Sequence, residues 1–266
     1  MPELPEVETV VRMLRPKLAG RTITAAEVLW RRSVGARVVR VWRRAKYIVL
    51  DLERGAKPAG AIVGHLRMTG RMHVEPQGFD PGPHAKVALA LDDGRTFHFI
   101  DVRKFGRFQW CADSARELAD LGPEPLGEEF TAEWLAAALK GRSRALKPLL
   151  LDQTFLAGLG NIYVDESLHR AGLHPLTRSD RVKPAQAAKL WTEIQSVLSG
   201  AIEHEGSSFD VFYRTPEGNP GSYQDEFQVY GRGGKPCRTC STTIRRFVVG
   251  QRGTHVCSHC QPRGRR

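Results

Sequence analysis

The sequence predicts an α+β fold in three parts: an N-terminal β-sandwich with flanking helices, a C-terminal helical domain, and a zinc-binding β-hairpin. Short β-rich runs separated by Gly, Pro and Asp turns fill residues 20–110. Helical periodicity dominates residues 131–203. Two Cys-x-x-Cys pairs, Cys237/Cys240 and Cys257/Cys260, follow with sixteen residues between them, a spacing typical of structural zinc sites.

The composition is that of a basic globular protein. The 266 residues are enough for two domains with their own cores, and the net charge of +11 indicates an anionic partner such as nucleic acid. No run of about 18 apolar residues could span a membrane. The N-terminus has no basic segment followed by an apolar one, as a signal peptide would. We therefore expect a cytoplasmic protein whose thiols bind metal.

The first predicted element is an amphipathic helix that begins after Pro2 and is kinked or ended near Pro16. Its apolar positions recur at helical spacing: Val7, Val10, Val11, Leu14 and Leu18. Pro2 and the acidic pair Glu3 and Glu6 are good helix starters, so the spacing alone favours a structural role. A functional alternative requires removal of Met1. Pro2 would then offer a secondary amine beside a carboxylate, and such an amine can form an iminium.

Five short strands are predicted next: Ala36–Trp42, Lys46–Leu52, Ala61–Leu66, Lys86–Leu91 and Arg95–Ile100. The sequence Asp92-Asp-Gly94 is a hairpin turn signal, and such a succession of strands suggests an antiparallel sandwich. Lys46 lies in a stretch rich in Lys and Arg that has no acidic residue. The sequence context alone predicts that Lys46 is a surface lysine and not a catalytic one.

Two loops, residues 65–70 and 101–106, place Met68 and Phe105 among basic side chains. Exposed apolar side chains of this kind can wedge into a base stack. The simpler alternative makes both of them ordinary core residues.

The charge reverses between Asp113 and Glu133, where seven acidic residues accompany one Arg, and this shift marks a domain boundary. Helices are expected at 131–140, 143–151, 162–171 and 184–203. The glycine-containing turn 156–161 opens the third of these helices. Its backbone N–H groups suit a phosphate, with Arg142, Arg144 and Lys147 near it in sequence.

The four paired cysteines predict one structural Zn²⁺ held by Cys237, Cys240, Cys257 and Cys260. Two disulfides or four free thiols are the alternatives. An alternating pattern around residues 243–249 and a turn at 250–253 predict a hairpin between the pairs. Residues 228–266 contain nine Lys or Arg and no Asp or Glu, which favours contact with nucleic-acid phosphates.

Taken together, these stretches resemble the formamidopyrimidine-DNA glycosylase family, bacterial enzymes that excise oxidised purines. The resemblance covers nearly the whole chain. Its motifs lie at residues 2–9, 43–47, 65–70, 101–106, 121–126, 150–153, 160–163 and 229–232, and in the zinc ribbon.

The resemblance implies a role for each matching residue. Pro2 would be the nucleophile, Glu3 the assisting acid, Lys46 the proton donor in β-elimination, and Arg252 the donor in δ-elimination. The hole left by a flipped base would be filled by Met68, Arg103 and Phe105. Contacts to the DNA backbone are implied for His65, His84, Arg142, Asn161, Tyr230 and Arg252.

The family pattern also implies a domain division. Residues 1–112 would form the catalytic β-sandwich domain and 113–130 a linker. Residues 131–227 would form a helical domain with a helix–two-turn–helix motif and a lesion-capping loop at 206–227, and 228–266 the zinc hairpin. The partner would be double-stranded DNA containing oxidised bases or abasic sites, bound by a monomer in a bacterial cytoplasm, near the nucleoid.

Two alternatives stay open at this point. An endonuclease VIII-like enzyme would act on oxidised pyrimidines, and a non-catalytic zinc-ribbon protein would only bind DNA. One departure from the pattern is the short segment Trp30–Val38, where relatives have a longer insertion. The short segment makes the local sheet edges uncertain, but it lies away from the residues named above and does not change their expected roles.

Overall fold

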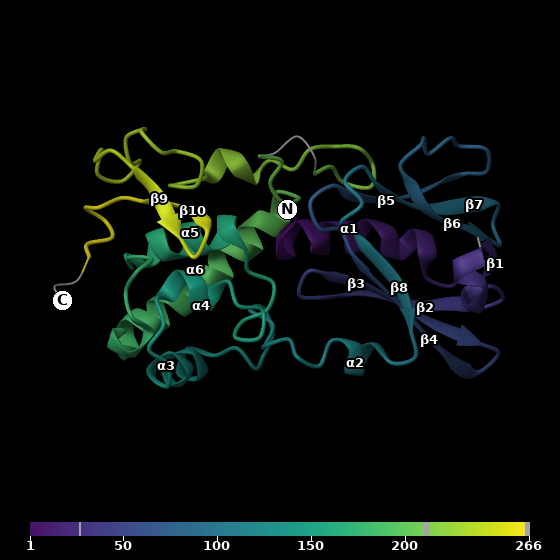
Figure 1. Ribbon diagram of the computed structural model, residues 1–266, viewed down its shortest axis with the longest axis horizontal. Coiled ribbons are helices and arrows are strands. Elements are labelled where there is room, and N and C mark those ends of the chain that lie inside the picture. Colours follow the sequence, from purple (N-terminus) through teal and green to yellow (C-terminus); the bar gives the residue numbers. More distant parts are fainter. Residues whose placement is uncertain (27, 210–212, 264–266) are drawn as a thin grey trace. The chain divides into compact units, whose positions relative to one another are not determined.

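The computed structural model describes residues 1–26, 28–209 and 213–263, without the side chains of 28–30. Residues 210–212 of the predicted lesion-capping loop and 264–266 of the predicted hairpin domain lie outside this description. The chain divides into two compact units (Figure 1). The sheet unit comprises Met1–Ala119 and His204–Ser222, and the helical unit comprises Asp120–Glu203 and Tyr223–Arg266.

The sheet unit contains two four-stranded antiparallel sheets, with strand orders β1-β6-β7-β5 and β2-β3-β4-β8. Its elements are α1 (Leu4–Leu18), β1 (Ile23–Ala26), η1 (Val28–Ser33), β2 (Arg37–Arg44), β3 (Tyr47–Arg54), β4 (Lys57–His65), β5 (Gly70–Pro76), β6 (Ala85–Leu91), β7 (Arg95–Asp101), β8 (Arg107–Cys111) and α2 (Ser114–Glu117).

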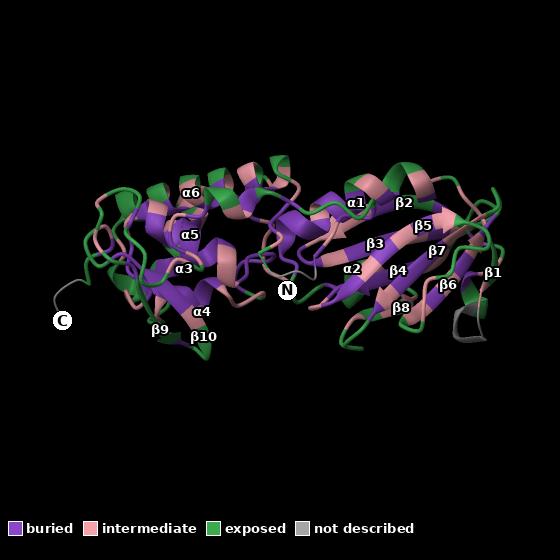
Figure 2. Ribbon diagram, turned by 90° about the horizontal axis from the view of Figure 1, so that it is seen from above, coloured by how far each residue is buried: buried purple, intermediate pink, exposed green. Residues whose placement is uncertain are grey.

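One apolar core fills the space between the two sheets, as the buried strand positions in Figure 2 show. Phe97 and Phe99 of β7 stack on Phe108 of β8, with ring centroids 5.4 and 5.6 Å apart. Helix α1 closes the same core with Val7, Val10, Val11, Leu14 and Leu18. The predicted β-sandwich with a flanking helix is therefore confirmed.

The described part of the helical unit contains four α-helices and the C-terminal hairpin. Its elements are α3 (Ala132–Lys140), α4 (Leu146–Leu150), α5 (Asn161–Ala171), η2 (Ser179–Arg181), α6 (Pro184–Glu203), η3 (Tyr223–Glu226), β9 (Arg245–Val249) and β10 (Arg252–Val256). Fully buried residues of α5 and α6, including Val164, Leu168, Leu190 and Ile194, form the centre of this unit. No helix in the described part of the chain could cross a membrane.

Several predicted elements differ from the observed ones. Helix α1 continues through Pro16 to Leu18: the proline removes one hydrogen bond, to the Arg12 carbonyl, and Ala19 N–H still reaches the Arg15 carbonyl. Three strands, β1, β5 and β8, and the single-turn helix α2 were not predicted. In β5 and β8 the outward positions are polar, so each strand offers few apolar residues in a row.

Candidate active site and nucleic-acid interface

In the sheet unit, the start of α1 is held in place by a buried carboxylate. Pro2 is buried and Glu3 is the N-cap of α1, in extended conformation. Glu6 Oε2 accepts a hydrogen bond from Glu3 N–H at 2.8 Å, and the two glutamates form a capping box. The backbone around the predicted nucleophile and its neighbouring acid is thus fixed by the helix itself.

The same carboxylate also holds the beginning of the predicted lesion-capping loop. Glu6 Oε1 accepts hydrogen bonds from Ser207 N–H at 2.8 Å and Ser207 Oγ at 3.2 Å. Gly206 has a φ of +81°, and a Cβ there would lie 2.8 Å from Glu6 Cγ, so glycine is required. Glu6 therefore links the N-terminus to this loop. The sequence reasoning placed Glu6 beside Glu3 but gave it no role.

Lys46 and His65 lie close together at neighbouring strand ends. Lys46 is 5% exposed and follows Ala45, whose φ is +54°. The interpretation as a surface lysine is therefore wrong. His65 is equally buried; Tyr47 packs edge-on against its ring at 4.8 Å, and Arg107 is its β-ladder partner.

His65 is held as a neutral hydrogen-bond donor. Arg67 N–H donates to Nδ1 at 3.0 Å, which leaves the ring proton on Nε2. Burial, followed by the positive charges of Arg67, Lys46 and Arg107, lowers the pKa of His65 to about 3. A neutral N–H donor among three cations suits an anion such as a DNA phosphate.

The three residues expected to fill the base-stack hole already contact one another. Arg103 Nη1 donates to Met68 Sδ at 3.1 Å, and its guanidinium lies 4.9 Å from the centre of the Phe105 ring. Phe105 is 54% exposed and Met68 is half-buried. The alternative that made them core residues is therefore wrong.

Asp101, which the sequence reasoning gave no role, organises both loops that carry these residues. It is 1% exposed and accepts hydrogen bonds from Thr69 Oγ1, from Arg103 N–H at 3.3 Å and from Gly106 N–H at 2.6 Å. Its own N–H donates to the carbonyl of the exposed His84 at 3.0 Å. The structure thus brings His84 next to the loop of Arg103 and Phe105.

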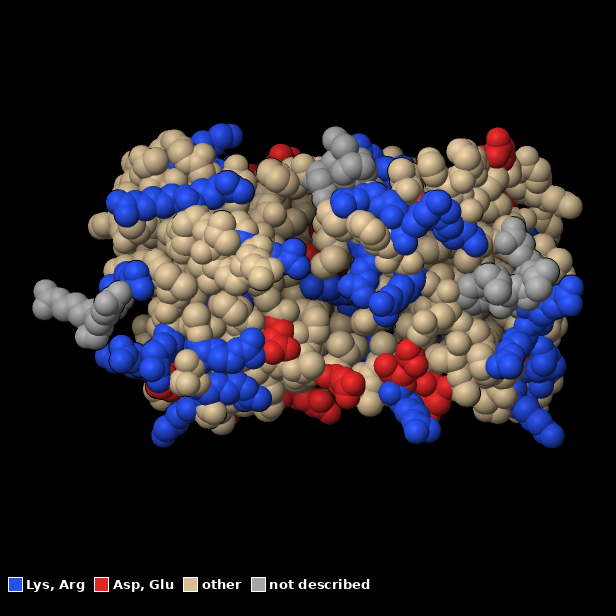
Figure 3. Space-filling view, viewed as in Figure 1, with Lys and Arg blue, Asp and Glu red and all other residues tan. Residues whose placement is uncertain are grey.

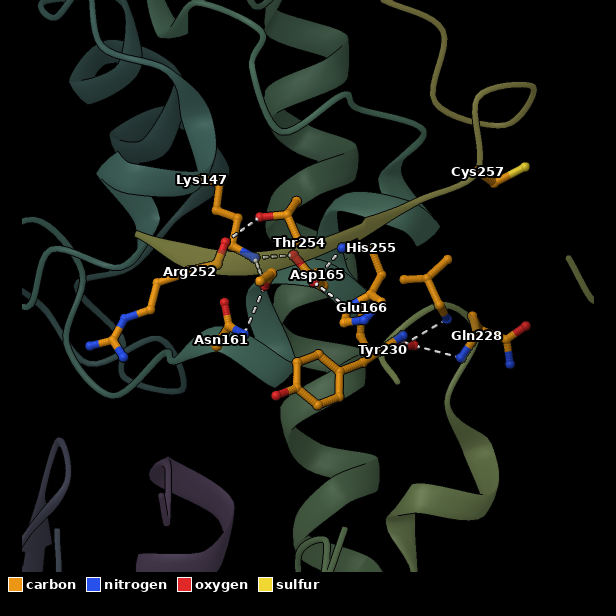
Figure 4. Close-up of polar contacts among 12 residues, drawn as sticks. Lys147, Asn161, Asp165, Glu166, Gln228, Tyr230, Arg252, Thr254, His255 and Cys257 are labelled. Atoms are coloured by element: carbon orange, nitrogen blue, oxygen red, sulfur yellow. Dashed lines mark hydrogen bonds and ion pairs between the residues drawn. The ribbon is translucent and has the colours of Figure 1, made fainter. Parts of the chain in front are cut away.

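In the helical unit, side chains of α4 and α5 contact β10. Asn161 Nδ2 and Lys147 Nζ both donate to the Gly253 carbonyl at 3.0 Å (Figure 4). Asp165 pairs with Lys147 at 2.6 Å and accepts His255 N–H at 2.9 Å. Lys147 and Asp165 are fully buried, so this network fixes the hairpin strand that begins at Arg252.

Glu166 anchors the segment that carries Tyr230. Its carboxylate accepts three backbone N–H groups, from Gln228 and Val229 at 2.9 Å and from Tyr230 at 2.8 Å. The Tyr230 ring packs against His255 at 5.1 Å. Arg252 is exposed at the start of β10, and its side chain points away from the buried cluster (Figure 4). The helical unit therefore brings Asn161, Tyr230 and Arg252 together around one network.

Among the basic residues at 142–147, the structure separates three different roles. Lys147 is buried in its pair with Asp165, and Arg144 pairs with Asp152 at 2.7 Å. Arg142 is exposed and forms no ion pair with any described residue. Its Nη1 donates to the Ala138 carbonyl at 3.0 Å and its guanidinium lies 5.0 Å from the centre of the Phe155 ring. Figure 3 shows Lys and Arg spread widely over the face drawn there, with Asp and Glu in a few clusters.

The four paired cysteines converge on one point. Their Sγ atoms all lie within 4.8 Å of one another, with separations of 3.4, 3.5 and 3.9 Å between neighbours. These distances exceed a disulfide bond, and all the cysteines are free. Four thiolates in a closed cluster fit a tetrahedral structural Zn²⁺.

Comparison with known proteins matches three family domains along the chain. The Formamidopyrimidine-DNA glycosylase N-terminal domain matches residues 1–108, the Formamidopyrimidine-DNA glycosylase H2TH domain matches 121–212, and the zinc finger found in FPG and IleRS matches 234–263. The formamidopyrimidine-DNA glycosylase of Chloroflexus aggregans is 44% identical, with 98% of each chain covered. That of Symbiobacterium thermophilum is 42% identical over 98% of this chain and 90% of its own.

The chain belongs to the formamidopyrimidine-DNA glycosylase family. It is thus an enzyme of this glycosylase and abasic-site lyase family, with one structural zinc ion bound by its four cysteines. The crystal structure of the MutM (Fpg) protein from Thermus thermophilus superposes with a TM-score of 0.88 at 40% identity, covering 99% of this chain and all of that one. A Lactococcus lactis Fpg mutant in complex with DNA containing Fapy-dG superposes with a TM-score of 0.87 at 32% identity, covering 98% of this chain and 100% of that one. The predicted fold class and zinc site of this glycosylase are confirmed.

Proposed function

We propose that this glycosylase excises oxidised purines, 8-oxoguanine and formamidopyrimidines, from duplex DNA and then cleaves the strand at the abasic site. The observation that carries the proposal is the N-terminus, where Pro2 lies buried at the start of α1 beside Glu3, and Glu6 fixes the backbone. Relatives of the same fold are solved with Fapy-dG and with abasic-site DNA, which supports the substrate class.

The proposed chemistry begins with the Pro2 amine, freed by removal of Met1. The amine attacks the sugar C1′ as the damaged base leaves with the bonding electrons, and Glu3 supplies the proton that opens the sugar ring. The resulting iminium withdraws electrons, so a neighbouring C–H loses its proton and the 3′ phosphate is expelled. A second elimination then expels the 5′ phosphate. Lys46 and Arg252 are the proposed proton donors for the two steps, and no redox cofactor is required.

The base must leave the duplex before this chemistry, at a cost of a few kcal/mol in unstacking. The contacting set Met68, Arg103 and Phe105 supports a role in filling the gap, because an exposed aromatic ring braced by a guanidinium enters a base stack without reorganising. His65, His84, Arg142, Asn161 and Tyr230 are the proposed DNA-backbone contacts.

The remaining proposals concern context. We infer the division into residues 1–112, 113–130, 131–227 and 228–266 given above, with the lesion-capping loop at 206–227. We further infer that the glycosylase acts as a monomer on damaged double-stranded DNA in the cytoplasm, near the nucleoid.

The experiment that tests the proposal compares duplexes carrying one defined lesion each. We expect excision of 8-oxoguanine opposite cytosine and of formamidopyrimidine, with phosphates left at both ends of the gap. Glu3→Gln should slow base loss strongly, whereas Glu53→Gln, which removes an acidic residue from the far end of β3, should not. Faster excision of thymine glycol than of 8-oxoguanine would instead assign the chain to the endonuclease VIII-like, pyrimidine-directed class.

A further inference from the structure

We propose that His169 is an outer partner of the zinc site that donates its Nε2–H to the Cys237 thiolate and so fastens α5 to the zinc hairpin. His169 lies in the last turn of α5, far in sequence from the cysteines. Its Nε2 is 3.7 Å from Cys237 Sγ, and the two residues are 6% and 3% exposed. The inference rests on the metal site of this chain and not on its proposed DNA chemistry.

The partners of the two ring nitrogens indicate where the proton lies. A neutral imidazole carries one N–H, and a thiolate sulfur only accepts hydrogen bonds. Nε2 faces the sulfur, whereas Nδ1 is buried and has no hydrogen-bond partner in the described part of the chain. A proton on Nε2 gives an N–H···S hydrogen bond, and a proton on Nδ1 would set two lone pairs against each other.

His169 also lines a pocket of about 620 Å³. Helix α6 contributes Lys189 and Glu193 to its lining, and Gln228 and Thr239 also line it.

The imidazole acts through the cysteine and not as a ligand. The side chains whose ligand atoms lie within 4.8 Å of one another are Cys237, Cys240, Cys257 and Cys260. Four thiolates complete the tetrahedral shell of a structural zinc ion and leave no open position. His169 contacts one member of that shell from outside.

A hydrogen bond from His169 to the Cys237 thiolate would offset part of the negative charge of the zinc site. One Zn²⁺ with four thiolates carries two negative charges, and Cys237 and Cys257 are almost fully buried. Backbone donors from the knuckles reach Sγ atoms at 3.4 and 3.5 Å, namely Thr239 N–H to Cys237 and Cys260 N–H to Cys257. His169 adds a side-chain donor from a different element, and outer-shell donors of this kind hold ligands in position.

The helix period places His169 in line with the other hairpin contacts. Asn161, Asp165 and His169 are four residues apart and so lie on one face of α5. They contact in turn Gly253 O, His255 and Cys237. Helix α5 therefore holds both the strand of Arg252 and the metal cluster.

The test measures metal retention in the zinc-loaded protein. We would compare His169→Phe, which fills the space without a donor, with His169→Gln, which keeps an N–H group. The matched control is His174→Phe, because His174 accepts Leu176 N–H and stacks on Phe247 without binding a cysteine. The readouts are zinc transfer to a chromogenic chelator and the sulfur-to-metal charge-transfer band of the Co²⁺-substituted protein.

Loss of an outer-shell hydrogen bond typically weakens metal affinity about 10–100-fold. We therefore expect His169→Phe to lose zinc about tenfold faster or more, with the Co²⁺ band at lower energy because the thiolate becomes more electron-rich. His169→Gln should lose zinc at a rate between those of His169→Phe and the unchanged protein. His174→Phe should lose zinc at the rate of the unchanged protein. Wild-type metal retention and an unshifted band in His169→Phe would overturn the proposal, as would an equal effect in His174→Phe. If His169→Phe does not fold, the same two measurements on His169→Leu, which also lacks a donor, replace it with the same expected result.

Discussion

The side chain of His65 is a buried imidazole that its surroundings keep neutral. Its Nδ1 is occupied by Arg67 N–H, and three cations surround it. A protonated ring would lose the acceptor for Arg67 and add a fourth positive charge. His65 is thus a donor of fixed tautomer over the whole range of physiological pH.

This arrangement predicts a measurable acid sensitivity. The pKa of His65 is about 3 in the folded chain and ordinarily 6.5, so between these values the unfolded chain binds a proton that the folded chain does not. The free energy of unfolding should therefore fall as pH drops from about 6.5 toward 3. In His65→Gln the free energy of unfolding should fall less steeply with decreasing pH, because the proton that His65 binds only in the unfolded chain is absent. Urea unfolding at several pH values across this range measures the slope. An unchanged slope in His65→Gln, with the same slope in the control His84→Gln at an exposed histidine, would contradict the assignment.

At the scale of single elements, α5 is the organising helix of the helical unit. Its buried Asp165 holds Lys147 and β10, and the adjacent Glu166 holds the segment of Tyr230. These acidic residues lie inside the helix, at positions where a sequence pattern predicts only a polar surface. Their partners are distant in the chain.

Removing one member of the buried pair should be costly. Asp165→Asn leaves the Lys147 ammonium without its counter-charge, and such a change typically lowers the free energy of unfolding by about 3–5 kcal/mol. Lys147→Met combined with Asp165→Asn should recover part of that loss, which a double-mutant cycle in urea measures. The exposed pair of Arg178 and Asp180 is the control, and Asp180→Asn should leave the free energy of unfolding nearly unchanged because water screens both charges. If Asp165→Asn and Asp180→Asn lowered the free energy of unfolding equally, the buried pair would be no more important for stability than the exposed pair.

The segment 206–222 gives a second prediction at this scale. It starts at the Glu6–Ser207 contact, and Pro216 O lies 3.0 Å from His73 Nδ1 on β5. A loop that closes over the base can reject normal guanine only through polar groups that a wrong base leaves unpaired. Shortening residues 216–222 should therefore slow 8-oxoguanine excision more than formamidopyrimidine excision or cleavage at an abasic site.

Single-turnover rates on the three substrates check this prediction. The matched control is Gln77→Ala in the β5–β6 connection, where the side chain is exposed. An equal loss on all three substrates would mean that the loop serves the fold and not lesion choice.

For the molecule as a whole, the charge balance predicts binding dominated by phosphates. With a net charge of +11, the logarithm of affinity for duplex DNA should fall linearly with the logarithm of salt concentration. Arg142→Ala should weaken binding to all sequences and reduce the salt slope by about 1. Arg178→Ala removes an arginine paired with Asp180 and should leave the slope unchanged. Affinity that hardly varies between low and physiological salt would contradict a phosphate-driven interface.

Sequence patterns predicted the sandwich, the main helices and the zinc hairpin because each depends on local periodicity or fixed ligand spacing. They could not assign Asp101, Glu6 or Asp165, whose partners come from distant segments. They also gave the wrong environment for Lys46, which looks exposed in a basic stretch and is buried by the turn that follows Ala45. The family pattern identified Met68 and Phe105 as functional where composition favoured the core, and the exposure of Phe105 agrees with the family pattern.

The central claim, that Pro2 is the covalent nucleophile, is tested most directly by trapping the iminium. The protein would be mixed with a duplex containing 8-oxoguanine or an abasic site and reduced with borohydride, and the cross-linked peptide would be located by mass spectrometry. We predict one adduct, on the N-terminal amine of Pro2, and none in protein that retains Met1. An adduct on Lys46, or efficient cross-linking with Met1 in place, would contradict the account.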